Sequence, residues 1–384
     1  MKTMKSKLLT ILAVSALGFT ACSDNDEPEP IIGGEVITEL NGNITEDATV
    51  GVASVKLTGM TIVRSGATLT IPAGTTITAN GGGNSVYLLV ERGAKIIAEG
   101  TAEKPIVFTS DVRKSGSWGG LLVNGAAPIS HATGGSNEAA TEINVDIKFG
   151  GDNVADDSGV LNYVKIEYSG AKIDDEAEHN GLTLNGVGNG TKINNIFIKD
   201  GADDGIEFFG GSVNVNNLLV VNSEDDMFDF SQGYTGTVTN AFGVWEPAYV
   251  STSSDPRGIE ADGNLDGDNP EAVNQSAFFV KNMTIVNNST AAEMNDIVKI
   301  RRGAKATITN LAIKLAETSK FADIIDFTDS KGNGVKESTI EYSFTPSSLF
   351  DALKIKNPEN VSLTKNETSQ GADVSVFGWT SFSF

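Results

Sequence analysis

The feature that most constrains the fold is an internal repeat in the middle of the chain. Residues 192–208 (KINNIFIKDGADDGIEF) align with residues 214–230 (NVNNLLVVNSEDDMFDF) at a shift of 22. Paired asparagines overlie paired asparagines, paired aspartates overlie paired aspartates, and the apolar residues keep their alternating positions. A shift of about 20 residues between short apolar runs is typical of one coil of a β-solenoid, in which equivalent residues stack on neighbouring strands.

A second repeat lies nearer the N-terminus. Residues 68–81 align with residues 87–100 at a shift of 19, which places Ile71 over Val90. The chain shows no convincing amphipathic helix, so we predict an all-β fold, a single-stranded right-handed parallel β-helix with about 19–24 residues per coil. The right hand is expected from the general preference of parallel crossovers. A β-sandwich or a propeller would need hairpins between neighbouring strands, and the coil-to-coil register argues against both.

The β-helix is predicted to span residues 35–384 with two interruptions. Residues 126–153 are rich in Gly, Ser and Asn, and residues 249–274 are dense in Asp, Gly and Pro, so both are expected to leave the solenoid as loops. The aromatic C-terminal segment, about 374–384, is expected to form a capping strand because the ends of a solenoid must be covered. Further coil strands are expected at 160–168, 181–184, 237–244, 282–286, 297–300, 307–313 and 324–327.

Residues 1–21 have the pattern of a bacterial lipoprotein signal peptide. Lysines precede an apolar run over 8–19, which is too short to span a bilayer, and the signal ends just before Cys22. A single cysteine in a secreted chain needs an explanation, and acylation of Cys22 supplies one, although an ordinary secretory signal is the alternative. The acidic, proline-containing residues 22–34 then form an extended tether.

The tether also bears on location. An acidic stretch directly after a lipidated cysteine is similar to the surface-export signal of lipoproteins in gut-type Gram-negative bacteria. We therefore expect an outer-membrane lipoprotein that faces the extracellular side and is held on the membrane by its acyl chains. The alternative is that residues 22–34 are only a solvated linker.

Charge and composition exclude several classes of protein. The chain has 50 acidic and 28 basic residues and a formal net charge of −22, so nucleic acid is not an expected partner. One cysteine and two histidines exclude a disulfide scaffold and a zinc site built from four cysteines.

Stacked aspartates are the first candidate site. Asp203 and Asp204 lie one coil from Asp225 and Asp226, and the same register places Glu207 one coil from Asp229. Carboxylates about one strand spacing apart repel one another unless a cation, a shared proton or water compensates them. Three interpretations stay open: a solvated acidic turn, a calcium site with oxygen ligands, or an acid/base pair for glycoside cleavage.

A second candidate follows the sequence D-x-N-x-D-G. Asp262, Asn264, Asp266 and Asp268 alternate as oxygen ligands do in the first half of a calcium loop. The closing glutamate is missing, because Val273 stands at the twelfth position. The segment is therefore either a calcium loop or a flexible acidic turn.

Basic residues give a third candidate. Polysaccharide lyases of this fold pair calcium with a basic residue that removes a proton beside a uronate carboxylate, and Arg301 is the candidate for that role here. The competing interpretation is that Arg301 and Arg302 neutralise neighbouring acids.

Aromatic residues give a fourth candidate. Trp118, Trp245, Tyr249 and Trp379 are able to stack on sugar rings if they are exposed on one face, and the alternative is packing in the core or the cap.

Four segments together resemble a known family. They are 116–121 (GSWGGL), 163–170 (YVKIEYSG), 203–211 (DDGIEFFGG) and 225–230 (DDMFDF), in that order. The set resembles bacterial surface or secreted parallel β-helix proteins that are related in fold to the pectate lyases. The resemblance implies the fold and the surface location, and it transfers no catalytic residue.

These observations predict a lipid-anchored, surface-displayed β-helix that binds extracellular glycans or host surface molecules without enzymatic activity. Its partners are then the membrane and an extracellular ligand, with calcium as the expected cofactor if there is one. The first alternative is a calcium-dependent polysaccharide lyase or glycoside hydrolase that acts at the stacked aspartates. The second alternative is a purely structural surface protein.

Overall fold

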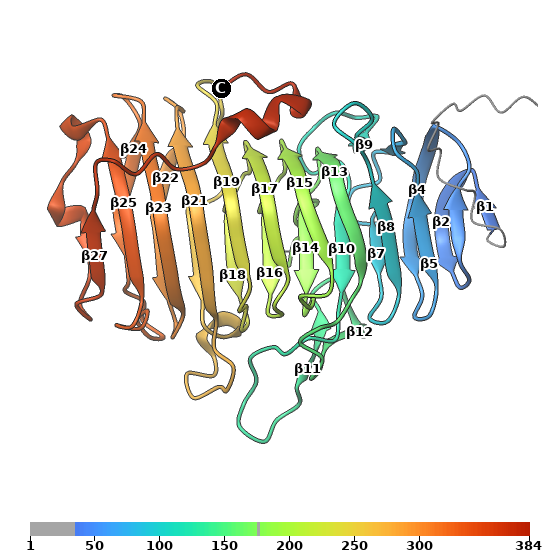
Figure 1. Ribbon diagram of the computed structural model, residues 1–384, viewed down its shortest axis with the longest axis horizontal. Helices are drawn as coiled ribbons and strands as arrows, with labels where there is room; N and C mark the ends of the chain where they lie inside the picture. The colour runs from blue at the N-terminus through green and yellow to red at the C-terminus, as the bar shows by residue number, and fades with distance from the viewer. Residues whose placement is uncertain (1–34, 175–176) are drawn as a thin grey trace, which may run out of the picture. The chain divides into compact units, whose positions relative to one another are not determined.

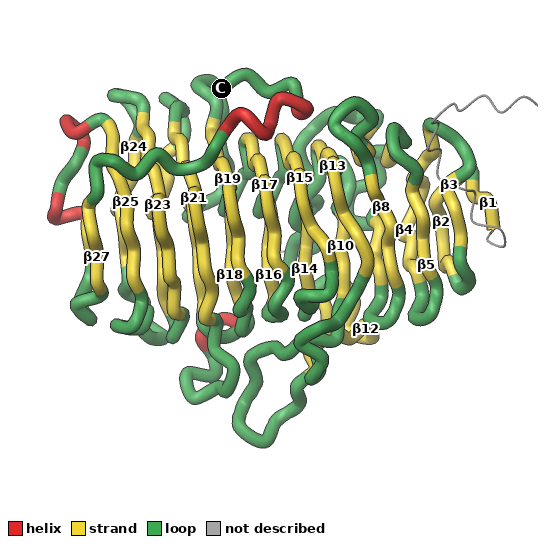
Figure 2. The backbone as a smooth tube through the Cα atoms, viewed as in Figure 1, coloured by secondary structure: helices red, strands yellow, loops and turns green. Residues whose placement is uncertain are grey.

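The computed structural model describes residues 35–174 and 177–384. The predicted signal peptide, Cys22 and the tether therefore lie outside the described residues. The described chain is a parallel β-helix, as predicted: its strands stack coil upon coil (Figures 1 and 2), and every pairing in the large sheet is parallel.

Each coil contributes strands to three faces of the solenoid. Near the N-terminus the first face holds the short strands β1 (Glu35–Ile37), β3 (Ala48–Val50), β5 (Thr68–Ile71) and β8 (Lys95–Glu99). The second face holds β2 (Glu39–Ile44), β4 (Ser54–Val63), β6 (Thr76–Ala79) and β9 (Ile106–Ser110), and the last residues of β2 and β4 continue into the third face.

From β13 to β25 one long strand in each coil spans the first and second faces. These strands are β13 (Gly159–Glu167), β15 (Lys192–Lys199), β17 (Asn214–Val221), β19 (Thr237–Trp245), β21 (Ala277–Asn287), β23 (Lys305–Leu315) and β25 (Thr339–Thr345). The shorter β27 (Ser362–Lys365) pairs with the first part of β25.

The third face carries one strand per coil and positions the candidate site. Its strands are β7 (Leu88–Val90), β10 (Leu121–Asn124), β14 (Leu182–Asn185), β16 (Ile206–Phe209), β18 (Phe228–Ser231), β20 (Arg257–Asp262), β22 (Glu293–Arg301), β24 (Lys320–Asp326) and β26 (Ile355–Lys356).

The central repeat has the register expected from its alignment. Asn194 pairs with Asn216, and Phe208 pairs with Phe230, 22 residues further on in each case. The rings of Phe208 and Phe230 stack inside the solenoid with their centroids 5.2 Å apart. The expected register of the first repeat is wrong: Leu69 pairs with Ile96, a shift of 27, because the chain makes longer turns between these coils.

Asparagines mark the corner where the long strands pass from the first face to the second. Asn195, Asn217, Asn240, Asn282 and Asn310 all have φ near +55°, a backbone conformation that asparagine tolerates better than most residues. Their side chains form a ladder: the Asn217 amide donates to the Asn195 oxygen at 3.0 Å, and the Asn240 amide donates to the Asn217 oxygen at 2.9 Å. The ladder satisfies polar groups of each coil with those of its neighbour.

The two predicted excursions have different structures. Residues 126–153 contain an antiparallel hairpin of β11 (Glu138–Thr141) and β12 (Asn144–Gly150), which lies outside the large sheet. The expectation of one continuous loop over 249–274 is wrong, because β20 pairs with β18 and β22 inside the third face. The charged residues that made this segment read as a loop alternate with buried Ile259 and Ala261 on that strand. Beyond β20 the chain leaves the sheet and forms the short helix η1 (Leu265–Gly267).

The aromatic C-terminal segment does not form the expected capping strand. It forms the 3₁₀ helix η4 (Val374–Thr380), which lies along the side of the solenoid above the long strands (Figure 1). Phe377 is fully buried there in a cluster with outward-facing apolar side chains of β15, β17, β19 and β21. The helices η2 (Ser347–Leu349) and η3 (Ala352–Lys354) lie near the last coil, where Phe350 packs against the core.

The asparagine ladder leads to a first prediction. Asn217→Ala removes two ladder hydrogen bonds. Alanine also lacks the polar side chain with which asparagine stabilises the backbone at φ +58°. We expect the free energy of unfolding to fall by about 2–4 kcal/mol in denaturant titrations. Asn217→Gly tolerates the backbone conformation and loses only the amide, so it should cost about half as much. Equal stability of both variants and the wild type would contradict a structural role for the ladder.

Candidate functional site

A row of side chains at one register position of the third face brings several buried charged groups side by side. Pairing between successive strands places each member beside the next, about one strand spacing away. Because residues alternate between the two sides of a strand, these side chains point out of the core while Ile206 and Phe208 point into it. We call this set the charged row; its members are Thr183, Glu207, Asp229, Glu260, Lys299, Asp326 and Lys356.

The half of the charged row on β20 to β26 is neutralised by cations of the chain itself. Glu260 accepts ion pairs at 2.8 Å from both Arg257 and Arg301, and Lys299 contacts Asp326 at 2.6 Å. Burial opposes ionisation of Asp326, but hydrogen bonds from Lys299 and Thr328 outweigh it and lower the pKa of this carboxyl. Even with two arginines beside it, burial raises the pKa of Glu260 to about 7.

The half on β16 and β18 has no such partners. Among the described residues, Glu207 and Asp229 form no ion pair, and neither do Asp203 and Asp204 in the turn before β16. Burial is the main cause that raises the pKa of Glu207 well above its usual range, and the carboxylates of Asp229, Glu142 and Asp203 add to it. Burial likewise raises the pKa of Asp204 and Asp229, with further repulsion from neighbouring acids.

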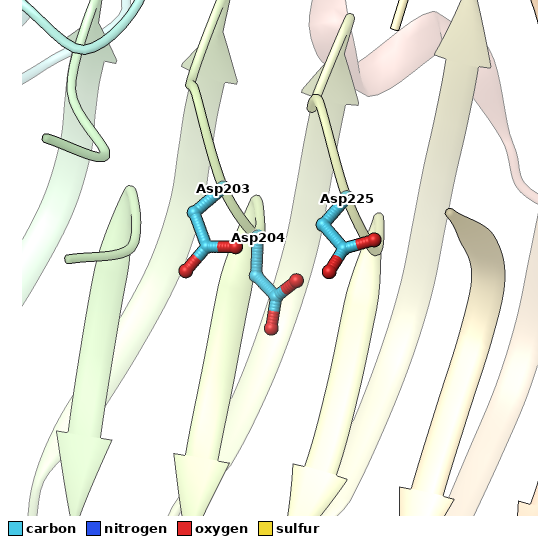
Figure 3. A group of neighbouring side chains, drawn as sticks. All are labelled: Asp203, Asp204 and Asp225. Atoms are coloured by element: carbon cyan, nitrogen blue, oxygen red, sulfur yellow. The ribbon is translucent and has the colours of Figure 1, made fainter. Parts of the chain in front are cut away.

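The stacked aspartates open onto a cavity of about 500 Å³, which we call the acidic pocket. Figure 3 shows Asp203 and Asp225 at equivalent positions of consecutive coils, with Asp204 beside them. One oxygen from each of these three carboxylates lies within 4.8 Å of the others. The Ser253 hydroxyl donates to Asp225 at 2.6 Å. The lining residues are Gly170, Lys172, Glu178, Ala202, Asp203, Glu224, Asp225, Thr252, Ser253, Ser254 and Asp255.

A second cavity, of about 220 Å³, adjoins the acidic pocket because both are lined by Glu224. We call it the tyrosine pocket, since Tyr168 and Tyr249 form part of its wall together with Arg113 and Asp200. Tyr249 is half-buried and packs against Trp245 with ring centroids 5.4 Å apart. The two pockets together present carboxylates, hydroxyls and aromatic rings side by side.

Comparison with known proteins agrees with this architecture. A family model described as a pectate-lyase-like β-helix domain matches residues 42–380. The chain belongs to this family. No curated protein matches the sequence.

Two solved structures resemble this β-helix domain at low similarity. The enzymatically active domain of tailspike protein 2 from bacteriophage CBA120 is 12% identical, with a TM-score of 0.34, and the match covers 82% of this chain and 47% of that one. The full-length tailspike protein 2 from the Escherichia coli O157:H7 bacteriophage CAB120 is 11% identical, with a TM-score of 0.31 and coverages of 82% and 42%. The chain thus spans less than half the length of these structures.

No helix in the described part of this pectate-lyase-like domain is both long and apolar enough to cross a membrane.

The structure separates the basic candidate from the acidic pocket. Arg301 contacts Glu260 and Asp262, at 2.8 and 2.7 Å, and Arg302 contacts Asp262 at 2.6 Å. Both arginines therefore neutralise acids of the chain, and Arg301 does not face the stacked aspartates. Asp226 lies beneath the pocket, buried, with Arg257 at 3.8 Å.

The predicted calcium loop is not assembled as one. The Asp262 carboxylate is bound by the two arginines, and the Asp268 carboxylate is bound by Lys331 at 2.7 Å. The Asn264 side chain is buried. Its nitrogen donates to Gln275 Oε1 and to the Arg302 carbonyl, and its oxygen accepts from the Asn269 amide. Asp266 occupies η1, where its main-chain oxygen accepts from Lys331. The residues of the D-x-N-x-D-G pattern thus bind hydrogen-bonding and charged groups of the protein itself. Their spacing in the sequence does not reveal these partners.

Two aromatic candidates are wrong as sugar-binding residues. Trp118 and Trp245 are fully buried, and their indole groups donate to the carbonyls of Glu167 and Ser223, at 2.8 and 2.9 Å. Trp118 precedes β10 and stacks on Phe108, Trp245 ends β19, and both indoles belong to the core. Tyr249 lines the tyrosine pocket. Trp379, half-buried in η4, packs against Tyr163 with ring centroids 5.3 Å apart.

Sequence reasoning missed several carboxylates of the site. Glu224 shares the repeated run with Asp225, so the alignment contained a signal for it. Glu178, Asp255 and Glu142 come from connecting segments without internal repeats, and only the fold brings them to the third face. Glu142 lies in the turn between β11 and β12, which explains how the hairpin contributes charge to the site.

The crowded carboxylates predict an unusual pH dependence. Glu207 is faced by Asp229 on the next coil, by Asp203 and by Glu142, and its folded pKa lies above the ordinary value of 4.5. A raised carboxyl pKa means that the native state loses stability as the pH rises from about 4.5 through the folded pKa. In chelator-treated protein, Glu207→Gln should therefore gain stability over the wild type with increasing pH, by up to about 1.4 kcal/mol per unit.

Denaturant unfolding of both proteins at pH 5, 6.5 and 8 measures this effect. The exposed Glu103→Gln serves as the matched control and should show no pH-dependent difference. A stability difference between Glu207→Gln and the wild type that stays constant from pH 5 to 8 would contradict a raised pKa at this position.

Proposed function

We propose that this protein is a surface-displayed binding module that holds an extracellular glycan, or a glycosylated host surface molecule, across the acidic and tyrosine pockets. The observation that carries the proposal is the junction of these two pockets at Glu224. Glu224 is common to the two linings, which together offer hydrogen-bonding groups and aromatic rings.

The lining has the chemistry that sugars require. Carboxylates accept hydrogen bonds from sugar hydroxyls, and the hydroxyls of Ser253 and Ser254 both donate and accept. Tyr168 and Tyr249 present amphipathic rings of the kind that pack on sugar faces. Lys172 pairs with Glu178 at 3.3 Å, so the pocket keeps a strong excess of negative charge. A neutral or amine-bearing glycan suits this pocket, whereas a polyuronate needs a bridging cation.

Display on the cell surface rests on the N-terminal sequence. The signal peptide, the acylated Cys22 and the acidic tether would place the β-helix outside the outer membrane, with the membrane as its first partner. The solenoid would then stand clear of the lipid on a chain of about a dozen residues.

The position of Arg301 argues against the lyase role considered for it. A lyase needs a base beside the substrate, and Arg301 is bound by Glu260 and Asp262 and does not line the acidic pocket. Lys172 does line that pocket, where it pairs with Glu178 at 3.3 Å.

One observation favours a glycoside hydrolase as the second candidate. The carboxylates of Asp203 and Asp225 approach within 4.8 Å at the pocket, and burial and mutual repulsion raise the pKa of Asp203 well above its usual range. A protonated and an ionised carboxyl group close together are the elements of acid/base glycoside cleavage.

The pocket variants test binding against catalysis. Full-length protein is screened on an array of bacterial and host glycans, and each hit is also assayed for newly formed reducing ends. We expect binding without cleavage, with Asp203→Asn and Asp225→Asn each weakening the affinity at least tenfold, because each removes a charged acceptor. The control Glu103→Gln should bind as the wild type does.

Two outcomes would contradict the binding proposal. Cleavage that both aspartate variants abolish would make the protein a hydrolase. The absence of any hit on the array would leave a structural surface protein.

The anchor is tested separately in cells. Cys22→Ala should abolish labelling by a fatty-acid analogue and release the protein from the membrane fraction. Replacing the acidic residues 24, 26, 27 and 29 with serine should preserve labelling but remove protease accessibility on intact cells. Unchanged labelling of Cys22→Ala would overturn the anchor, and unchanged accessibility of the serine variant would overturn the role of the tether.

A further inference from the structure

The two halves of the charged row differ in how their charge is compensated. On β20 to β26 both carboxylates of the row lie beside a lysine or arginine of the chain, with Arg257 beside Glu260 and Lys299 beside Asp326. On β16 and β18 the same register positions hold Glu207 and Asp229, with no cation of the described chain in contact. Something else must therefore balance the charge in that half whenever these groups ionise.

Three carboxylates converge there beside the acidic pocket, and one of them, Asp204, also belongs to the group formed with Asp203 and Asp225. One oxygen from each of Asp204, Glu207 and Asp229 lies within 4.8 Å of the others. The three side chains are only 7%, 9% and 8% exposed, so little bulk water reaches them. Asp203 and Asp225, by contrast, are the aspartates that line the acidic pocket.

Protein donors leave part of this group unsatisfied. Asp204 accepts from the Asp226 amide at 2.9 Å, and Glu207 accepts from the Asn180 side chain at 2.6 Å and from the Ser231 hydroxyl at 3.4 Å. Within residues 35–174 and 177–384, Asp229 Oδ1 has no hydrogen-bond partner although the side chain is more than nine-tenths buried. An unpartnered buried carboxylate oxygen inside a group of acids can accept a further ligand.

Asn180 lies beside Glu207 and carries a further unpartnered oxygen. The residue is 2% exposed, its nitrogen contacts Glu207, and its Oδ1, on the other side of the amide, has no partner among the described residues. A half-turn of the amide exchanges nitrogen and oxygen, which directs the carbonyl oxygen toward the carboxylates. The Thr183 hydroxyl stands next to Glu207 in the charged row and adds a further oxygen.

We propose that Asp204, Glu207 and Asp229 bind a calcium ion, with the side-chain oxygen of Asn180 as a further ligand. All the donors are oxygens, which suits a hard cation rather than zinc or copper. Calcium accepts the irregular arrangement of six to eight oxygens that such a site offers, whereas magnesium keeps several waters in strict octahedral geometry. The ion takes the place that Arg257, Arg301 and Lys299 occupy further along the row and joins the coils of β16 and β18.

This ligand set shares only Asp204 with the calcium ligands expected from the sequence. It excludes Asp203 and Asp225 in the acidic pocket, and it excludes the loop of Asp262, whose carboxylate is bound by two arginines. The proposal is also independent of glycan binding. The competing arrangement is a proton shared between Glu207 and Asp229, which needs no metal.

Calcium titration of the full-length protein in detergent tests the proposal. The chelator-treated protein at pH 7.5 is titrated with calcium, and in a second arm with magnesium, by calorimetry and by thermal melting. We expect one strong calcium site, a rise of several degrees in Tm and much weaker binding of magnesium. The double variant Glu207→Gln/Asp229→Asn should lose the heat of binding and the rise in Tm.

A matched variant separates this site from the acidic pocket. Asp203→Asn/Asp225→Asn should keep calcium binding within a few-fold of the wild type, while near-ultraviolet circular dichroism confirms that both double variants are folded. Calcium binding that is lost with Asp203→Asn/Asp225→Asn and kept with Glu207→Gln/Asp229→Asn would overturn the proposal and assign the ion to the pocket. No heat and no rise in Tm in the wild type would overturn it in favour of a shared proton.

Discussion

The parallel hydrogen bonding between successive coils is the constraint on which the rest of this structure depends. It places each residue directly beside its equivalent in the next coil, so chemistry that occurs once in a repeat occurs again about one strand spacing away. For asparagine this stacking is favourable, because an amide donates to one neighbour and accepts from the other, as Asn217 does between Asn195 and Asn240. For carboxylates it is unfavourable, since every acid is brought beside another acid.

The chain compensates this repulsion in one half of the third face and not in the other. Toward the C-terminus, substitutions within the row place Lys299 between Glu260 and Asp326, and Arg257 and Arg301 reach in from the adjoining residues. Around β16 and β18 the repeat keeps its acids, and buried oxygens of Asp229 and Asn180 have no partner in the part of the chain that the structure describes. The site is therefore defined less by unusual residues than by the lack of the cations that accompany the same acids elsewhere.

The sequence predicted the fold well where coils follow one another without insertions. Residues 192–230 satisfied that condition, so the alignment found both the register and the stacking of Asp203 over Asp225. Residues 68–100 did not, because their longer turns shift Leu69 onto Ile96 and disguise the pairing. From the sequence, the strand Arg257–Asp262 is predicted to be a loop because charged residues usually face solvent. Here partners distant in sequence balance these charges, which the sequence does not show. The carboxylates of Glu142 and Glu178 come from non-repeating connections, for which a repeat alignment holds no information.

The C-terminal segment has a consequence for the order in which the molecule is completed. Thr380 accepts a hydrogen bond from Lys165, 215 positions earlier, and the Asp373 amide donates to Asn240, 133 positions earlier. Phe377 covers an apolar strip contributed by several coils that precede it in the chain. That strip stays open to water until the last residues of the chain are available, however early its own coils form. The C-terminal segment therefore covers this strip only in the complete chain. A truncated chain would expose an apolar patch, prone to aggregation, along a solenoid whose coils have already formed.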